Sequence, residues 1–244
     1  MKAMILAAGL GTRLRPLTNT TPKPLLSVGG TPLIVWNLLL LRRHGLRDVL
    51  INLHYLGAQI EQALGDGSRY GMRIAYSHEP VILGTGGGLK QAESWFGGES
   101  VVVVNGDTLV EIDLGEVCAR HRERRATVTM VLREDPEAVR WGLVEMDAQQ
   151  RVHRINGKGS IGTAAPVQRM FAGLHVFEPR VLQRLPPAGT ESSVIEAYTG
   201  ALADGELIVG YDVRGYWSDV GTPERYAQAE RDVAVGLIAL SGRS

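Results

Sequence analysis

A run of four valines at 101–104 constrains the fold of this 244-residue chain more than any other stretch. An unbroken apolar strand is typical of a parallel sheet whose two faces are both covered. Strand-like and helix-like segments alternate through the first half of the chain, as they do in βαβ units. The strands are expected at 3–8, 48–53, 72–77 and 100–107, and the helices between them at 32–45, 57–67 and 87–96.

The second half of the chain has shorter strands separated by turns, which favours antiparallel or mixed pairing. Strands are expected there at 126–132, 142–147, 151–156, 169–177 and 206–213. Helices are expected at 115–125, 179–185 and 192–205, with a glycine-rich loop at 157–166 and a closing turn and helix after 215. The predicted fold class is α/β: a Rossmann-like sheet, mostly parallel or mixed and flanked by helices.

Composition and charge exclude several classes of protein. Lysine plus arginine and aspartate plus glutamate both number 26, so the chain lacks the basic excess of a nucleic-acid binder. No apolar run reaches the roughly 20 residues that a membrane helix needs, and the N-terminus does not resemble a signal peptide. The single cysteine, Cys118, excludes an internal disulfide and is expected to be a small buried residue. These features predict a cytoplasmic protein without nucleic-acid or membrane partners.

The opening stretch LAAGLGTRLRPLTNTTPKPL carries the strongest chemical signal. It is not a P-loop, and Leu14 stands where a dinucleotide fingerprint needs its third glycine. Gly9 and Gly11 still allow the backbone to approach a ligand closely, and successive N–H groups can form an anion-binding nest. Arg13 can grip phosphate oxygens in a fork, and Lys23 adds a point charge. The alternative is a surface loop whose basic residues are merely solvated.

This stretch closely resembles the signature of the sugar-1-phosphate nucleotidyltransferases, also called NDP-sugar pyrophosphorylases, and later motifs extend the resemblance over nearly the whole chain. The resemblance implies a nucleotide-diphospho-sugar transferase fold in one domain, 1–244. Its nucleotide-binding half would span about 1–112 and its sugar-binding half about 113–244, with no β-helix domain. Arg13 and Lys23 would be catalytic, and the nucleotide would also contact Leu6, Ala8, Gly9, Gly11 and Thr12.

Two aspartates far apart in the sequence complete the pattern. Asp107 ends the valine strand, at the sheet edge where α/β proteins bind ligands, and Asp219 lies in GYWSDVGTP. Two carboxylates suit Mg²⁺, which fills its shell with phosphate oxygens and water. Each aspartate could instead cap a local turn or helix. The resemblance implies that both bind the metal.

Two further segments bear on substrate specificity by resemblance. The segment EPVILGTGGG is expected to approach the base, with Glu79 nearby and Gly84 and Gly86 in contact, although a flexible turn is the alternative. On the sugar side the resemblance indicates Asn105, Gly173 and Lys158. Gly157 stands where many members have a glutamate, and Arg154 is an alternative to Lys158 for the sugar phosphate.

The implied reaction joins a nucleoside triphosphate and a sugar 1-phosphate and releases pyrophosphate. The overall pattern favours GTP with mannose 1-phosphate. UTP with N-acetylmuramate or N-acetylglucosamine 1-phosphate, and GTP with heptose 1-phosphate, are the alternatives within the family.

Three other classes remain open. They are a cytidylyltransferase that activates phosphocholine, a non-catalytic nucleotide-sugar-binding regulator, and a dehydrogenase. Homo-oligomerisation is also open, because the apolar stretch 32–41 suits a core or an interface.

Overall fold

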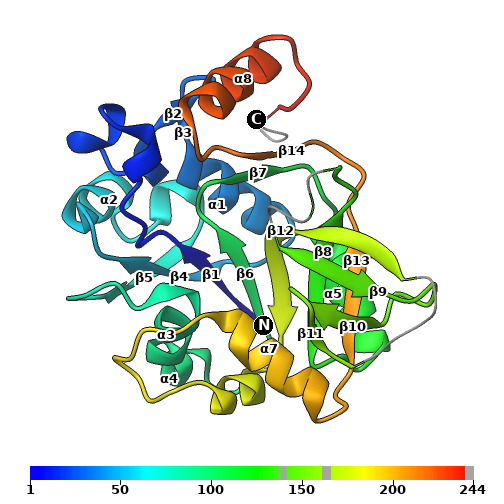
Figure 1. Ribbon diagram of the computed structural model, residues 1–244. Coiled ribbons are helices and arrows are strands. Elements are labelled where there is room, and N and C mark those ends of the chain that lie inside the picture. The colour runs from blue at the N-terminus through cyan, green and yellow to red at the C-terminus, as the bar shows by residue number, and fades with distance from the viewer. Residues whose placement is uncertain (137, 139–141, 161–165, 240–244) are drawn as a thin grey trace. The chain divides into compact units, whose positions relative to one another are not determined.

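The computed structural model describes residues 1–136, 138, 142–160 and 166–239 (Figure 1). Its chain forms two compact units whose segments interleave along the sequence. Unit 1 takes Met1, Leu83–Val103 and Asp113–Arg214, and unit 2 takes Lys2–Ile82, Val104–Ile112 and Gly215–Ser244. The single domain with halves meeting near residue 112 stays a prediction.

Unit 2 contains a parallel sheet of β1 (Lys2–Leu6), β4 (Asp48–Leu53) and β5 (Arg73–His78), coloured blue to cyan in Figure 1. In the register, Ile5 lies opposite Ile51, and Ile51 lies opposite Tyr76. The carboxyl ends of these strands meet at one edge, where a parallel sheet presents its ligand-binding loops.

The helices of unit 2 follow from local sequence signals. They are α1 (Leu33–Arg43), α2 (Gly57–Leu64) and α8 (Pro223–Ala234). Helix α1 is apolar on most of its surface and correspondingly buried, and Gly45 just beyond its end has φ of +77°. Helix α8 starts after Thr222, whose hydroxyl accepts a hydrogen bond from the backbone N–H of Arg225, with Pro223 at the first helical position.

Two short antiparallel pairs complete unit 2: β2 (Ser27–Val28) with β3 (Thr31–Pro32), and β7 (Thr108–Val110) with β14 (Trp217–Asp219). The sequence did not indicate β7. One apolar cluster joins the opening loop to both segments, because Leu14, Leu109 and Val220 are all buried in it. Strand β6 (Val101–Asn105) contributes residues to both units.

Unit 1 is built on a mostly antiparallel sheet. Strand β12 (Val167–Phe177) pairs antiparallel with β9 (Leu143–Met146) through its first residues and with β8 (Val128–Arg133) along most of the rest. Beyond β9 lie β10 (Val152–Ile155) and β11 (Lys158–Gly159), both antiparallel. Beyond β8 lies β13 (Ile208–Asp212), which is parallel to it. The expected loop at 157–166 thus begins with a short strand, and residues 161–165 of it lie outside the described residues.

The helices of unit 1 are α3 (Gly84–Gln91), α4 (Glu93–Phe96), α5 (Leu114–Glu123) and α7 (Val194–Ala203), with a 3₁₀ helix at Pro179–Arg184. The segment expected as one helix at 87–96 is helical but divided in two at Ala92, and its first helix begins three residues earlier, at Gly84. Packing overrides the low helix propensity of glycine here. A Cβ on Gly84 or Gly86 would lie 2.6 or 2.7 Å from the backbone of Ser192 or Ser193.

The parallel sheet of unit 2, the mixed sheet of unit 1 and the helices of both confirm the α/β fold class. Cys118 is free and buried, as expected. No helix in the described part of the chain combines the length and the apolar character that crossing a bilayer requires.

Candidate active site

The loop after β1 folds into three short 3₁₀ turns at Thr12–Leu14, Leu17–Asn19 and Lys23–Leu25. Gly11 has φ of +63°, and its carbonyl accepts a 2.8 Å hydrogen bond from the hydroxyl of the buried Thr18. A Cβ on Gly11 would lie 3.2 Å from Cβ of Lys23, so a side chain would crowd the loop. The loop therefore holds its two cations on a folded backbone.

The β7–β14 pair brings the two aspartates together. Asp219 lies opposite Thr108, the residue after Asp107, and the N–H of Val220 donates a 2.9 Å hydrogen bond to the carbonyl of Asp107. Lys23 Nζ forms an ion pair with the Asp107 carboxylate. The turn that carries Asp107 is tied to β1, because the N–H of Gly106 donates to the carbonyl of Leu6 at 2.9 Å.

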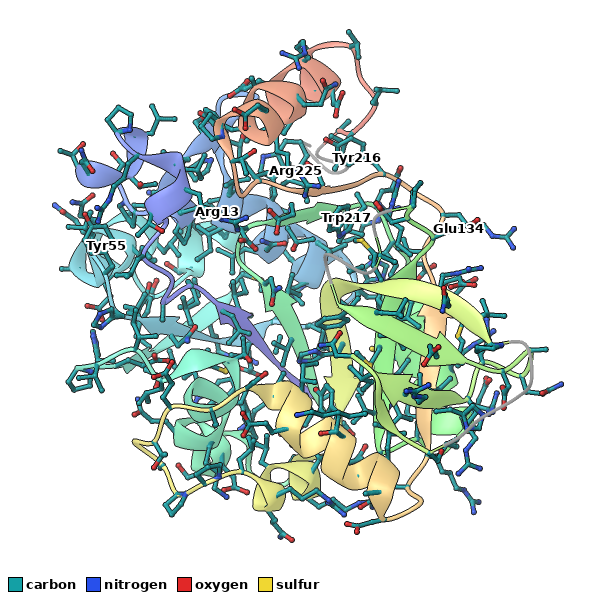
Figure 2. The ribbon with its side chains drawn as sticks, in the orientation of Figure 1. Arg13, Tyr55, Glu134, Tyr216, Trp217 and Arg225 are labelled. Carbon is teal, nitrogen blue, oxygen red and sulfur yellow. The ribbon has the colours of Figure 1, made fainter. Side chains whose placement is uncertain are left out.

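Two arginines lie beside Asp219. A Cβ on Gly221 would come under 3.0 Å from both Asp219 Oδ1 and Arg13 Nη2, which shows how closely these groups approach the Gly221 backbone. Arg225, in the first turn of α8, places Nη1 4.0 Å from Asp219 Oδ1, and its guanidinium carbon is 6.0 Å from the centroid of the Trp217 ring. Figure 2 labels Arg13, Trp217 and Arg225, which come from the opening loop, β14 and α8 of unit 2.

The charges around Asp219 are of mixed sign. Burial, followed by the neighbouring Asp107 carboxylate, raises the pKa of Asp219, while Lys23, Arg13 and Arg225 oppose that rise. We call these five residues the charge cluster: Arg13, Lys23, Asp107, Asp219 and Arg225. Three cations against two carboxylates make a site suited to a polyanion such as a phosphate chain.

The charge cluster also has the donors for a divalent cation. Asp219 Oδ1 is buried and has no hydrogen-bond partner within the described residues. Among those residues no group of three or more His, Cys, Asp or Glu side chains forms a self-sufficient metal site. Two carboxylates fit a cation such as Mg²⁺, which is usually held by one or two carboxylates together with substrate phosphates and waters.

A buried glutamate lies next to the start of the glycine loop. Asn52 Oδ1 accepts a 2.8 Å hydrogen bond from the N–H of Ala7, and Asn52 Nδ2 donates to Glu79 Oε1 at 2.7 Å. Glu79 is 4% exposed, and its carbonyl lies 2.7 Å from His54 Nδ1. One asparagine at the end of β4 therefore connects this carboxylate to the backbone just before Ala8.

Unit 1 has a pocket of quite different character. It measures about 390 Å³ and lies at the N-terminal ends of α3 and α7, lined by Gly84, Thr85, Glu191, Ser192, Ser193 and Glu196. Thr85 Oγ1 accepts from the N–H of Val194 at 3.1 Å, which ties the two helix starts together. We call it the hydroxyl pocket, because its lining offers hydroxyls and carboxylates and no cation.

The other predicted sugar-side residues of unit 1 are dispersed. Gly173 is buried in β12 with φ of +77°, where the register against β8 shifts. Lys158 is exposed on β11, which packs against α7. Arg154 donates to the carbonyl of Gly157 at 3.0 Å and lies 3.4 Å from Glu145 Oε2. Arg154 is thus already paired, whereas Lys158 extends from a hairpin.

Within unit 2 the structure brings Arg13, Lys23, Asp107 and Asp219 together, and it connects Leu6, Ala8 and Gly11 to the same loop. Sequence reasoning missed Arg225 and Asn52. A signal existed for Asn52, which is the polar residue inside the apolar strand DVLINL. Sequence reasoning also missed most of the hydroxyl pocket, since nothing in the sequence connects 191–196 with Gly84.

The chain matches known proteins over most of its length. The nucleotidyl transferase family model matches residues 2–235. The chain is 37% identical over 238 residues to a mannose-1-phosphate guanylyltransferase of Mycobacterium tuberculosis, covering 96% of this chain and 65% of that protein. It is 39% identical over 234 residues to an N-acetylmuramate alpha-1-phosphate uridylyltransferase of Neisseria meningitidis, covering 94% of this chain and 97% of that protein.

The chain therefore belongs to the nucleotidyl transferase family. Its relatives are sugar-1-phosphate nucleotidyltransferases by name, which confirms the expected enzyme class. The fold is that of a UDP-glucose pyrophosphorylase from Acinetobacter baumannii, with a TM-score of 0.78 at 21% identity over 94% of this chain and 91% of that one.

Proposed function

We propose that the chain transfers a nucleotidyl group from GTP to mannose 1-phosphate, giving GDP-mannose and pyrophosphate. An oxygen of the sugar phosphate attacks the α-phosphorus, and the bond from that phosphorus to the bridging oxygen of the pyrophosphate breaks. The nucleophile is already an anion, so no general base is needed, and catalysis consists of positioning and charge stabilisation.

The charge cluster supports this chemistry. Arg13 stabilises negative charge on the α-phosphate and the departing pyrophosphate, and Lys23 moves from Asp107 to hold the triphosphate in line. Asp107 and Asp219 would hold Mg²⁺, which would supply positive charge to neutralise the substrate phosphates. Gly9 has no atom within 4 Å of the position a Cβ would take, so its backbone is open to a phosphate.

In this proposal, Glu79 determines the preference for GTP over UTP. Guanine presents two adjacent donors, N1–H and the N2 amino group, and a carboxylate accepts both. Uracil presents one donor, N3–H, between two carbonyl oxygens that a carboxylate repels. Asn52 Nδ2 donates a hydrogen bond to Oε1 of Glu79, which holds the carboxyl group in place.

A specific observation favours a second candidate. The chain spans 97% of the N-acetylmuramate alpha-1-phosphate uridylyltransferase but only 65% of the mannose-1-phosphate guanylyltransferase. UTP with N-acetylmuramate or N-acetylglucosamine 1-phosphate is therefore the alternative substrate pair. Under either reading Gly84 and Gly86 contact the base, Gly173 takes the sugar, Asn105 faces the sugar or ribose, and Lys158 takes the sugar phosphate. Such substrates are cytoplasmic metabolites, so we assign the chain to the cytoplasm.

The test is pyrophosphate release with Mg²⁺ across a grid. The grid sets GTP, UTP, dTTP, CTP and ATP against mannose, glucose, N-acetylglucosamine, N-acetylmuramate and heptose 1-phosphates, with phosphocholine added. We expect the highest kcat/KM for GTP with mannose 1-phosphate. A higher value for UTP with N-acetylmuramate 1-phosphate would establish the alternative.

The variant Glu79→Gln isolates the proposed cause. An amide keeps the hydrogen bond from Asn52 but offers guanine a donor where guanine needs an acceptor. We expect kcat/KM for GTP to fall about tenfold to a hundredfold and the value for UTP to rise. Glu61→Gln, on α2 of the same unit, is the matched control and should leave the GTP/UTP ratio unchanged. An unchanged ratio in Glu79→Gln would remove Glu79 from base recognition.

A further inference from the structure

The charge cluster contains one more cation than the proposed chemistry assigns. Arg13 and Lys23 alone would balance Asp107 and Asp219, and Arg225 adds a third positive charge. Arg225 comes from α8, outside the opening loop, and nothing in the proposed reaction requires it. Its position next to a proposed metal ligand needs a separate explanation.

Arg225 is fixed against Asp219 by its surroundings. Its backbone N–H donates to Thr222 Oγ1 at 3.4 Å, which sets it in the first turn of α8. Its guanidinium lies near the Trp217 ring, two residues before Asp219 on β14. The side chain is 30% exposed and the Asp219 side chain 20%, so water screens this pair only partly.

Asp107, the second carboxylate of the charge cluster, also has a cation beside it. Lys23 Nζ is paired with Asp107, and the Lys23 side chain is only 11% exposed. A divalent cation that approached the two carboxylates alone would meet three positive charges in the same small volume. A triphosphate brings about four negative charges and reverses that balance.

We propose that Arg225 is a positioning residue for the charge cluster. Its guanidinium attracts the Asp219 carboxylate and keeps free divalent cations out of the cluster until a nucleotide is bound. This inference rests on the proposed metal role of Asp107 and Asp219. Metal binding therefore depends on nucleotide binding, and the protein without nucleotide has a low affinity for the metal.

The experiment measures Mn²⁺ binding by water-proton relaxation, with no sugar phosphate present so that no turnover occurs. The wild-type protein with Mn²⁺ alone should show no saturation below about 1 mM. Mn²⁺ with GTP, or with UTP, should give a ternary complex whose relaxation enhancement exceeds that of the Mn²⁺–nucleotide mixture without protein.

The informative variant is Arg225→Gln, which removes the charge and keeps a polar side chain. We expect its affinity for Mn²⁺ alone to rise at least tenfold over the wild type. Arg225→Lys keeps the charge and should behave as the wild type, and Arg231→Gln removes a charge from the exposed side of the same helix and should change nothing. The double variant Arg225→Gln/Asp219→Asn should lose the gained affinity.

The outcomes separate two failures. If the wild type forms no ternary complex with either nucleotide, the proposed metal site is wrong. If the ternary complex forms but Arg225→Gln, shown by circular dichroism to be folded, gains no Mn²⁺ affinity, the inference about Arg225 is wrong. Tight Mn²⁺ binding by the wild type without nucleotide would also overturn it, as would a gain that survives Asp219→Asn.

Discussion

The charge cluster of unit 2 and the hydroxyl pocket of unit 1 are opposite kinds of site. The first gathers five charged side chains, and Lys23 and Asp107 are already paired within it. The second is lined by hydroxyls, glycine and carboxylates at two helix starts. Phosphates need concentrated charge, whereas neutral hydroxyl groups need directed hydrogen bonds. Under the proposed function, the phosphates are therefore bound in unit 2, and unit 1 supplies directed hydrogen-bonding groups.

The largest effect is expected from the removal of one carboxylate of the charge cluster. Asp107→Asn should lower kcat about 10²- to 10³-fold, because a neutral amide neither holds a divalent cation as well nor balances Lys23. Metal dependence of turnover and circular dichroism are the measurements. Near-normal activity in a folded variant would refute the metal assignment. Asp48→Asn, at the start of β4 where Asp48 pairs with Arg73, is the control.

The next prediction tests which of the two substrates Arg13 acts on. Arg13→Ala should lower kcat about a hundredfold and change the affinity for the sugar 1-phosphate little, because Arg13 is proposed to act on transition-state charge. Steady-state kinetics with each substrate varied in turn would measure this. A loss confined to the KM of the sugar 1-phosphate would move Arg13 to the other substrate.

The two glycines Gly9 and Gly106 give a sharper comparison within unit 2. Gly9 has open space where a Cβ would lie, so Gly9→Ala should keep the melting temperature but raise the KM for the nucleotide about tenfold. A Cβ on Gly106 would lie 2.7 Å from the Leu6 carbonyl, so Gly106→Ala should instead lower the melting temperature. Equal effects of both substitutions would contradict the close-approach role of Gly9.

The last prediction concerns the stability of the core of unit 1, away from both sites. His175 is buried, stacks on Phe171 at 5.4 Å, and burial lowers its pKa to about 3. Below pH 6.5 the unfolded chain binds a proton that the folded chain does not, so stability falls as the pH drops towards 3. The loss between pH 6.5 and 5 should be about 2 kcal/mol.

Urea unfolding at pH 5 and 7 would measure this loss, with His175→Gln as the comparison. The variant should have a flatter dependence on pH than the wild type. Burial also lowers the pKa of His121, but Glu178 opposes that shift, and the difference between the two proteins removes the contribution of His121. Parallel pH profiles would show that His175 does not titrate in this way.

Apolar runs made much of the fold predictable. The strand at 48–53 was predicted to the residue, since four apolar residues within six positions between turns have few other structures open to them. The cations and aspartates of the charge cluster were predictable because their residue types are unusual at those spacings. Strand β7 was not predictable, because its three residues carry no pattern and its partner β14 lies more than a hundred residues away.

The start of α3 and the proposed role of Arg225 could not be predicted from the sequence, for a related reason. Glycines at 84, 86 and 87 indicate a loop until the neighbouring segment at 190–194 is known to pack on them. Arg225 is one of many arginines, and only its distance to Asp219 distinguishes it. Both features depend on contacts between residues far apart in the sequence, and local propensity carries no information about such contacts.

The pairing of β7 with β14 has a consequence for protein synthesis. Residues Asp113–Arg214 of unit 1 are translated between the two strands, so Asp219 reaches Asp107 only after that segment has been made. At about 5–20 residues per second, a ribosome needs roughly 5 to 20 s to cover that interval. A nascent chain therefore carries Arg13, Lys23 and Asp107 for seconds without the second carboxylate. Until unit 1 has been made, the nascent chain therefore lacks the second carboxylate that the proposed metal site requires.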